Sequence, residues 1–410
     1  MNVVVIGAQW GDEGKGKIVD FLAENAKVVV RYSGGANAGH TIVHAGETYK
    51  LHLIPSGILY ADTTVVLGTG MVIDPDALFE ELETLTEQGV GWEGRVLVSD
   101  RAHLVLPGYR EIDRETDQKR IKPLGTTGRG IGIAYSMKAT RDGMRLSDLA
   151  EPEALERLDD TNRSHLADVG PRLRQMTVDL VEFLQHTSKA DHILFEGAQG
   201  ALLDLDQGTY PYVSSGYSAA AGASLGGGIG PRQIDRIIGV CKAYSTRVGN
   251  GPFPSEFRGG DDTGLEELVR EKGREYGVTT GRARRCGYLD LVALRYIVRA
   301  NGIDSLALTH LDVYDTLDEV KVCVAYETDD GVHDSFPSSA YLLERCRPVT
   351  KTFSGWKSDI GEIRRYDDLP ENARAYLEFI ENFVGAPIDL VGVGYRREQT
   401  ILRRDPWTRS

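Results

Sequence analysis

The first loop constrains this chain more than any other feature. A short apolar segment, Val3–Ile6, is followed by Gly11-Asp12-Glu13-Gly14-Lys15-Gly16-Lys17, which has the glycine and lysine spacing of a phosphate-binding loop. The next residue is Ile18, where that pattern needs a serine or threonine to hold Mg²⁺. A carboxylate next to bound phosphate needs a metal between them or acts as a base. The loop therefore predicts a nucleotide, Mg²⁺ and an acid–base residue, Asp12, in one place.

The same segment indicates the fold class. The loop leads into a helical pattern and then into a second strand at 28–32, a unit typical of a parallel sheet covered by helices. We expect an α/β fold with a large, mostly parallel central sheet flanked by helices. Further strands are expected at 64–67, 96–99, 192–195, 237–244, 305–309 and 388–393, and helices at 75–86, roughly 150–187, 289–300 and 370–384.

No linker divides the chain, so we expect one domain over residues 1–410. Its inserted subregions are expected to be mainly helical at about 75–190 and partly antiparallel at about 318–365. An antiparallel strand is predicted at 321–327, followed by a polar turn.

Charge and composition exclude several classes of function. The net charge is -14, so the overall field of the chain does not favour non-specific nucleic-acid binding. The four cysteines form no CxxC pair, which argues against a zinc site or a disulfide framework. No apolar run approaches the ~20 residues of a membrane span. The first strand begins too early for a signal peptide. We expect a cytoplasmic protein.

Glycine is clustered in loops that also carry Thr, Asn, Gln or Arg. Glycine lets the backbone approach a ligand closely, so that successive N–H groups can face an anion. Single clusters also occur in ordinary turns, but several together favour a site for more than one phosphate. The clusters lie at 33–41, 125–132, 197–200, 226–230 and 277–282.

Two further groups are candidates for chemistry. His40 follows Gly39 in the loop after the second strand, which would place it opposite Asp12 at the carboxyl edge of the sheet. A carboxylate base and an imidazole donor suit a reaction in which one atom loses a proton while another gains negative charge; a purely structural histidine is the alternative. Arginines at 282, 284 and 285 adjoin a Thr-Thr pair and suit carboxylate or phosphate binding, unless they form a solvated surface.

These motifs together resemble the adenylosuccinate synthetase family, whose members join aspartate to IMP using GTP. The resemblance extends from the first strand to the final Arg-Asp-Pro. The matching stretches are Gln9–Lys17, Asn37–Thr41, Leu51–Gly57, Gly125–Gly132, Phe195–Gly200, Gly208–Val213 and Lys242–Gly249.

The resemblance implies a mechanism. Asp12 would be both base and Mg²⁺ ligand, with the carbonyl of Gly39 as a second ligand, and it would deprotonate N1 of IMP so that O6 attacks the γ-phosphate of GTP. His40 would donate to the phosphoryl oxygens or the leaving group, and aspartate would then displace phosphate from C6. Asp12, His40 and Gln199 form the implied catalytic group.

The resemblance also implies the binding residues. IMP and aspartate would contact Asn37, Ala38, Thr127, Arg141, Gln199, Ser214, Thr279, Thr280, Gly281 and Arg282. Arg141 would reach the IMP phosphate of a neighbouring subunit, which implies a homodimer. GTP would contact Gly11, Asp12, Glu13, Gly14, Lys15, Gly16, Lys17, Gly39, His40, Thr41, Arg284, His310, Leu311, Asp312, Gly392, Val393 and Gly394.

The guanine end departs most from the family pattern. The usual Thr-Lys-Leu-Asp is Thr-His-Leu-Asp at 309–312, so His310 replaces a lysine while Asp312 remains to accept from the guanine N1 and 2-amino groups. The last loop is Gly392-Val393-Gly394-Tyr395, where the family more often has Ser-Thr-Gly-Pro. Ala283 replaces a common arginine, whose role is therefore not carried over.

Two alternatives remain open. A related viral branch acts on dGMP with ATP, but it loses the loop aspartate that is present here as Asp12. A non-catalytic GTPase-like nucleotide switch predicts Ser or Thr at position 18 and no aspartate-binding arginine loop, and Ile18 and Arg282 oppose it.

Overall fold

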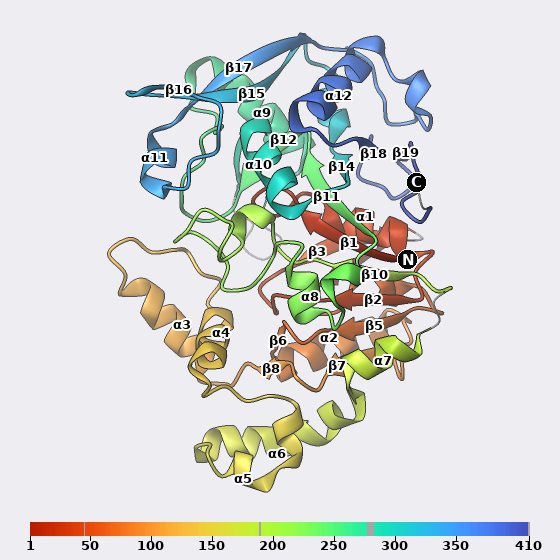
Figure 1. The fold of residues 1–410 in the computed structure, drawn as a ribbon, viewed down its shortest axis with the longest axis vertical. Coiled ribbons are helices and arrows are strands. Elements are labelled where there is room, and N and C mark those ends of the chain that lie inside the picture. The colour runs from red at the N-terminus through yellow and green to blue at the C-terminus, as the bar shows by residue number, and fades with distance from the viewer. Residues whose placement is uncertain (45, 188–189, 277–282, 409–410) are drawn as a thin grey trace. The chain divides into compact units, whose positions relative to one another are not determined.

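The computed structural model describes residues 1–44, 46–187, 190–276 and 283–408, and Figure 1 shows their elements. Backbone contacts divide the chain into two compact units. Unit 1 comprises Met1–Val4, Val19–Ala198 and Ser214–Asp235, and unit 2 comprises Val5–Ile18, Gln199–Val213 and Arg236–Ser410. The predicted single domain over 1–410 stays a prediction.

Unit 1 contains a parallel array of strands. The strand order is β10-β2-β5-β7-β9, and each neighbouring pair is parallel. These strands are β2 (Val28–Arg31), β5 (Thr64–Leu67), β7 (Val96–Ser99), β9 (Thr177–Val178) and β10 (Ile193–Glu196). Short pairs are formed by β3 (His40–His44) with β4 (Glu47–Leu51), antiparallel, and by β6 (Val72–Ile73) with β8 (His103–Leu104), parallel. Most residues of the central strands β2 and β5 are buried, as in sheets covered on both faces.

The helices that lie wholly in unit 1 are found between its strands and after the last of them. They are α2 (Pro75–Glu87), α3 (Tyr109–Gln118), α4 (Ile131–Thr140), α5 (Pro152–Leu155), α6 (Asp160–Met176), α7 (Leu180–His186) and α8 (Gly222–Gly226). Helix α1 (Lys15–Ala23) starts in unit 2 and continues into unit 1. Helix α2 begins where Asp74 caps it, with Pro75 in its first turn, and α3 packs against α4 (Figure 1).

Unit 2 contains two sheets. In the first, β11 (Arg236–Lys242), β14 (Ser305–Thr309) and β18 (Ile388–Gly392) are parallel neighbours, and β19 (Thr400–Leu402) is antiparallel to β18. The second contains β12 (Tyr244–Arg247), β13 (Arg285–Asp290), β15 (Glu319–Thr328), β16 (Gly331–His333) and β17 (Arg347–Ser354), mostly antiparallel. The helices are α9 (Thr263–Lys272), α10 (Leu291–Asn301), α11 (Ala340–Arg345) and α12 (Glu371–Val384), and α10 packs against α12 (Figure 1).

Strand β1 (Asn2–Gly7) contributes to both units, because its first residues belong to unit 1 and Val5–Gly7 to unit 2. In unit 2 its carboxyl end leads into the loop that carries Asp12. Strands β11, β14 and β18 belong to the same sheet, and each is also followed by a loop. In open α/β sheets, ligands bind in the crevice outside the carboxyl ends of the strands. The fold therefore places the first loop where a ligand site is expected.

The predicted fold class, a large and mostly parallel sheet flanked by helices with smaller antiparallel subregions, is confirmed. The prediction of helix over roughly 150–187 is wrong at 177–178, because the β-branched pair Thr-Val forms β9 beside β7. The predicted helix at 289–300 begins at Leu291, since Leu289 and Asp290 complete β13.

Two further observations concern the described residues alone. All four cysteines there are buried thiols without a disulfide. None of the described helices combines the length and the apolar character that a membrane span requires.

Asp290 joins strand β13 to helix α10. Its carboxylate accepts a hydrogen bond from the Ala293 N–H at 2.9 Å, which caps the helix, and from the Tyr326 hydroxyl at 2.7 and 2.8 Å. Burial nevertheless raises the pKa of Asp290 to about 6. Because the folded chain binds this proton more tightly than the unfolded chain, ionisation of Asp290 lowers stability as the pH rises from about 4 to about 6.

We predict that Asp290→Asn removes this pH dependence, because the amide cannot ionise. Between about pH 4 and pH 7, the wild type should lose roughly 2 to 3 kcal/mol of unfolding free energy relative to the variant. Urea unfolding of both proteins across this range measures the difference. Parallel stability curves would show that Asp290 titrates normally in the folded chain.

Candidate active site

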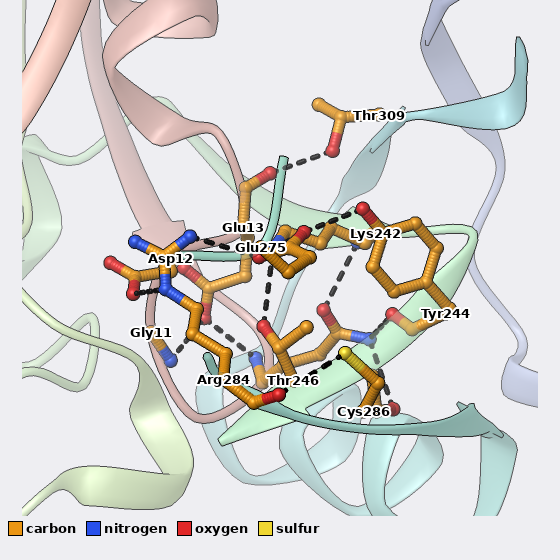
Figure 2. A network of polar contacts seen from close by, with 12 residues as sticks. Gly11, Asp12, Glu13, Lys242, Tyr244, Thr246, Glu275, Arg284, Cys286 and Thr309 are labelled. Carbon is orange, nitrogen blue, oxygen red and sulfur yellow. Dashed lines mark hydrogen bonds and ion pairs between the residues drawn. The ribbon is translucent and has the colours of Figure 1, made fainter. Parts of the chain in front are cut away.

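The loop between β1 and α1 is folded around the carboxylate of Glu13. This side chain is completely buried, and its Oε1 accepts hydrogen bonds from the N–H groups of Gly11 at 2.8 Å and Gln9 at 3.2 Å (Figure 2). Lys15 Nζ lies 2.5 Å from Oε2. A buried carboxylate is costly unless it is paired and hydrogen-bonded. The conformation of the loop therefore depends on this one side chain and its partners.

Two glycines leave room for the Glu13 carboxylate. A Cβ atom on Gly7 would lie 2.4 to 2.6 Å from the Glu13 carboxyl atoms. One on Gly200 would lie 2.2 Å from the carbonyl oxygen of Gln9 and 2.5 Å from Glu13 Oε1. Real Cβ atoms do not approach other atoms so closely, so both positions require glycine.

The loop is also anchored to the surrounding strands. Thr309, at the end of β14, donates from Oγ1 to the carbonyl oxygen of Glu13 at 2.7 Å (Figure 2). The side-chain amide of Gln9 donates to the carbonyl oxygen of Tyr244 at 2.9 Å and accepts from the N–H of Lys242 at 3.0 Å. The loop therefore has a fixed position relative to β11, β12 and β14.

Asp12 is the loop carboxylate that remains accessible. Its backbone is in the left-handed region, with φ of 59°, which is uncommon for a residue other than glycine and frequent at functional sites. The side chain is 33% exposed, whereas that of Glu13 is fully buried. Arg284 Nε lies 2.8 Å from Asp12 Oδ2 (Figure 2). Glu13 is therefore committed to the fold of the loop, whereas the Asp12 carboxylate stays partly exposed.

Arg284 connects Asp12 to a second, buried carboxylate. Its Nη1 donates to Glu275 Oε2 at 2.9 Å, while Lys242 Nζ and the Tyr244 hydroxyl each donate to Oε1 at 2.5 Å (Figure 2). Burial alone would raise the pKa of Glu275, but the Lys242 ammonium and the hydrogen bonds lower it to about 2. Burial opposes the charge of Arg284, yet Asp12 and Glu275 raise the pKa of its guanidinium. Glu275 and Arg284 are therefore both charged at neutral pH.

Lys17 connects helix α1 to the last loop of the chain. Its Nζ donates to the carbonyl oxygens of Gly394 at 2.7 Å and Gln399 at 2.8 Å. Burial lowers the pKa of Lys17 to about 8, although the nearby Asp312 favours the charged form. A Cβ on Gly392 would lie 3.3 Å from Lys17 Nζ, so this glycine accommodates the lysine. Two segments predicted to bind GTP are thus brought together.

His310 and Asp312 follow strand β14, where guanine binding is predicted. The backbone of His310 is left-handed, with φ of 60°, and its ring packs edge-on against Tyr244 at 5.8 Å between centroids. Burial, together with the charge of Lys242, lowers the pKa of His310 to about 3, so its ring is neutral. Burial raises the pKa of Asp312, and among the described residues its buried Oδ1 has no hydrogen-bond partner. Asp312 is therefore an acceptor suited to a ligand donor.

His40 lies in unit 1, as the first residue of β3. Its Nε2 is 3.0 Å from the Ser56 hydroxyl and 3.9 Å from Glu196 Oε1. Glu196 is buried and its Oε2 accepts from the N–H of Ser56 at 3.0 Å. Hydrogen-bond partners of this kind determine the orientation of an imidazole ring. Gly39 precedes His40, and Thr41 is exposed in the same strand.

The other predicted residues of unit 1 lie in loops and at helix ends. Thr127 lies in the exposed loop before α4, and the N–H groups of Leu124, Gly125 and Thr126 in the same loop donate to the Asp117 carboxylate at 2.8 to 3.2 Å. The remaining ones are Arg141, exposed at the end of α4 with φ of 71°, the half-buried Asn37 and Ala38 in the loop after β2, and Ser214.

The remaining predicted residues lie in unit 2 or outside the described ranges. Gln199 follows β10 with a left-handed backbone, φ of 56°. Gly14 and Gly16 flank Lys15 at the start of α1, Leu311 is buried after His310, and Val393 is buried after β18. Thr279, Thr280, Gly281 and Arg282 lie outside the described residues.

Comparisons with known proteins identify the family of this chain. The family model described as adenylosuccinate synthetase matches residues 4–165 and 159–401. The adenylosuccinate synthetase of Synechococcus sp. (strain RCC307) is 50% identical, covering 99% of this chain and 97% of that protein. That of Nostoc sp. (strain PCC 7120) is 49% identical, covering 99% and 95%.

The chain belongs to the adenylosuccinate synthetase family.

Solved structures add to this assignment. The fully ligated adenylosuccinate synthetase of Plasmodium falciparum superimposes with a TM-score of 0.91 at 39% identity, covering 98% of this chain and 99% of that one. The succinoaminodeoxyadenylate synthetase of cyanophage S-2L, bound to dGMP and dATP, has a TM-score of 0.65 at 21% identity and coverages of 98% and 95%. The phage enzyme therefore shares the fold, and this likeness supports no conclusion about substrates.

Three site residues were not predicted from the sequence of this family member. Glu275 was not singled out, and Lys242 and Tyr244 were noticed only as part of a matching stretch. One signal was present, because Lys242 directly follows the apolar residues of β11 and a lysine in a buried strand needs a partner. The sequence does not show that this partner is Glu275, which lies in a distant turn.

The loop glycines lead to a test of the role of Glu13 in folding. We predict that Gly7→Ala lowers the free energy of unfolding by about 1 to 3 kcal/mol, because the added methyl group overlaps the buried carboxylate. Chemical denaturation measures the change. Gly264→Ala is the matched control, since Gly264 is exposed in α9 with no atom within 4 Å of the added Cβ. An equal loss in both variants would contradict the predicted role of Glu13.

Proposed function

We propose that this protein joins L-aspartate to IMP with hydrolysis of GTP, giving adenylosuccinate, GDP and phosphate through a 6-phosphoryl-IMP intermediate. This is a GTP-dependent carbon–nitrogen ligase reaction of purine biosynthesis. Family membership over the whole chain supports it. The observation that carries it is the retained carboxylate Asp12, accessible in a loop whose other carboxylate is committed to folding.

Asp12 is proposed to take the proton from N1 of IMP. Oxygen at C6 is a poor leaving group, so deprotonation must accompany phosphorylation of O6 before the aspartate amine can displace phosphate. The Arg284 contact orients the Asp12 carboxylate. In unit 1, His40 is oriented by Ser56 and is proposed to donate to the phosphoryl oxygens or the leaving group.

The residues present fit a Mg²⁺ site of the kind that uses few protein ligands. Among the described residues, no cluster of three or more His, Cys, Asp or Glu side chains could hold a metal. Mg²⁺ commonly binds one or two carboxylates together with substrate phosphates, so Asp12 is proposed as its carboxylate ligand. The family resemblance assigns the carbonyl of Gly39 as a second ligand. When bound there, Mg²⁺ would offset the negative charge of the phosphates.

The family resemblance assigns the residues that bind the two nucleotides. The IMP residues are proposed to be Asn37, Ala38, Thr127, Gln199 and Ser214, with aspartate on residues 279–282. GTP is proposed to bind the loop at 11–17, residues 39–41, Arg284, residues 310–312 and the loop at 392–394. The exposure of Arg141 supports its proposed reach to the site of a second subunit in a homodimer. The protein is proposed to be cytoplasmic.

The alternatives are weaker. The dGMP-dependent reaction has only a distant structural relative in its favour, and at 21% identity that relative supports the fold alone. The switch hypothesis is opposed by a full-length match to a family of ligases.

We predict that the protein produces adenylosuccinate when it is supplied with Mg²⁺, aspartate, IMP and GTP. The shift in purine absorbance measures product formation. Asp12→Asn should lower turnover by about 100- to 10,000-fold, because an amide cannot accept the proton. The variant should remain folded, since Asp12 is partly exposed. Far-UV circular dichroism checks this.

Substrate pairings decide between the hypotheses. The pairs dGMP with ATP, IMP with ATP, and dGMP with GTP serve as controls in the same assay. Product from dGMP and ATP alone would replace the proposed reaction by the viral one. Near-normal turnover of Asp12→Asn would refute the base assignment even if the ligase activity were present.

A second prediction concerns guanine selection. Asp312→Asn should raise the KM for GTP by about 10- to 100-fold, because hydrogen bonds to an ionised acceptor are lost. The same amide can donate to the 2-carbonyl group of xanthine, so XTP should become a better phosphoryl donor. Steady-state kinetics with GTP and XTP measure both effects. An unchanged preference for GTP would show that Asp312 does not contact the base.

A further inference from the structure

Glu275 has no assigned function in the reaction, yet its carboxylate is buried and held by three side chains. Its two oxygens accept hydrogen bonds from Lys242, Tyr244 and Arg284. We propose that Glu275 is a positioning residue that holds the guanidinium of Arg284 against Asp12. This inference rests on the proposed function, because it assigns Asp12 the proton transfer.

The bridging geometry of Arg284 supports the proposal. One side of its guanidinium, Nε, lies 2.8 Å from Asp12 Oδ2, and Nη1 donates to Glu275 Oε2 at 2.9 Å (Figure 2). A planar guanidinium held by two carboxylates loses the freedom to rotate about its side-chain bonds. Glu275 is buried and Asp12 is 33% exposed. Glu275 is therefore the fixed end of the bridge, and Asp12 is the end that the bridge orients.

The carboxylate of Glu275 is held in place by Lys242 and Tyr244, which contact its other oxygen. Lys242, the last residue of β11, donates to Glu275 Oε1 at 2.5 Å and to the Thr246 hydroxyl at 3.1 Å. Tyr244 in β12 donates to the same Oε1 at 2.5 Å. One carboxylate oxygen is thus held by the strands, and the other is directed at Arg284. Movement of Glu275 would break contacts with β11 and β12, so Arg284 has a rigid support.

The charges of the group also favour this arrangement. The Lys242 and Arg284 cations are balanced by the carboxylates of Glu275 and Asp12. If Glu275 lost its charge, Arg284 and the buried Lys242 would share only the Asp12 carboxylate. Buried cations without a partner are costly, so the side chains would rearrange. The orientation of Asp12 would then no longer be fixed.

The next residue along the chain offers a matched control. Arg285 forms an ion pair with Glu256, with Nε to Oε1 and Nη2 to Oε2 both at 2.6 Å. This pair also lies in unit 2, and its contacts within the described part of the chain do not include Asp12 or Glu275. Glu256→Gln therefore weakens a neighbouring, more exposed arginine–carboxylate pair without disturbing the bridge to Asp12.

The first test separates turnover from binding. Glu275→Gln should lower kcat by about 100-fold, because a base misplaced by about an ångström loses its alignment. The KM for IMP should stay within about 3-fold of the wild-type value, since Glu275 is not among the residues proposed to bind IMP. Glu256→Gln should leave both parameters within about 3-fold. A folded Glu275→Gln variant with near-wild-type kcat would overturn the proposal.

A second variant keeps the test decisive if Glu275→Gln does not fold. Glu275→Asp retains the negative charge beside Lys242, but its side chain is one methylene shorter and cannot reach Lys242 and Arg284 together. It should fold and lose kcat by at least about 10-fold with little change in KM. An unchanged kcat in Glu275→Asp would likewise overturn the proposal.

A spectroscopic measurement distinguishes failure of this inference from failure of the proposed function. In protein labelled with ¹⁵N-arginine, the Arg284 Nη1–H that donates to Glu275 should exchange slowly with water in the wild type and rapidly in Glu275→Gln. In Glu256→Gln, only the Arg285 signal should change. If the wild type made no adenylosuccinate, the proposed function would fail while this signal would still test the bridge. A slow Arg284 signal in both the wild type and Glu275→Gln would overturn the bridge.

Discussion

The conformation of the loop between β1 and α1 depends on a single buried carboxylate, that of Glu13. It gathers two backbone N–H groups of its own loop and the Lys15 ammonium, and its close contacts require glycine at positions 7 and 200. Without it, the N–H groups of the loop would have no common acceptor in the protein interior. The ion pair of Glu13 with Lys15 thus mainly stabilises the backbone conformation of the loop.

The loop conformation set by Glu13 determines what Asp12 can do. Asp12 has a left-handed backbone that directs its carboxylate to Arg284, away from the buried Glu13. Adjacent carboxylates in the sequence therefore differ in environment and function. An ordinary phosphate-binding loop has a hydroxyl after its lysine, but here Ile18 is fully buried in the core. The metal and proton chemistry proposed for this loop falls to Asp12.

The sequence predicted much of the fold because its signals were local. The strand–loop–helix start, the strand at 64–67 and the family motifs depend on neighbouring residues. The contacts of Lys17 with the loop near Gly394 and of Lys242 with Glu275 could not be predicted, because they join segments distant in sequence. Strand β9 was missed for the same reason, since its two residues gain their strand character from pairing with β7.

Glu13 stabilises the fold of the loop, whereas Asp12 is proposed to act in the reaction. The free energies of unfolding of variants at these two positions test this difference most directly. Urea denaturation of Glu13→Gln and Asp12→Asn beside the wild type should show a loss of roughly 2 kcal/mol or more for Glu13→Gln, which disrupts a buried charge pair. Asp12→Asn should change the same quantity by less than about 1 kcal/mol, since its pair is partly exposed. Equal losses, or a larger loss for Asp12→Asn, would contradict the account.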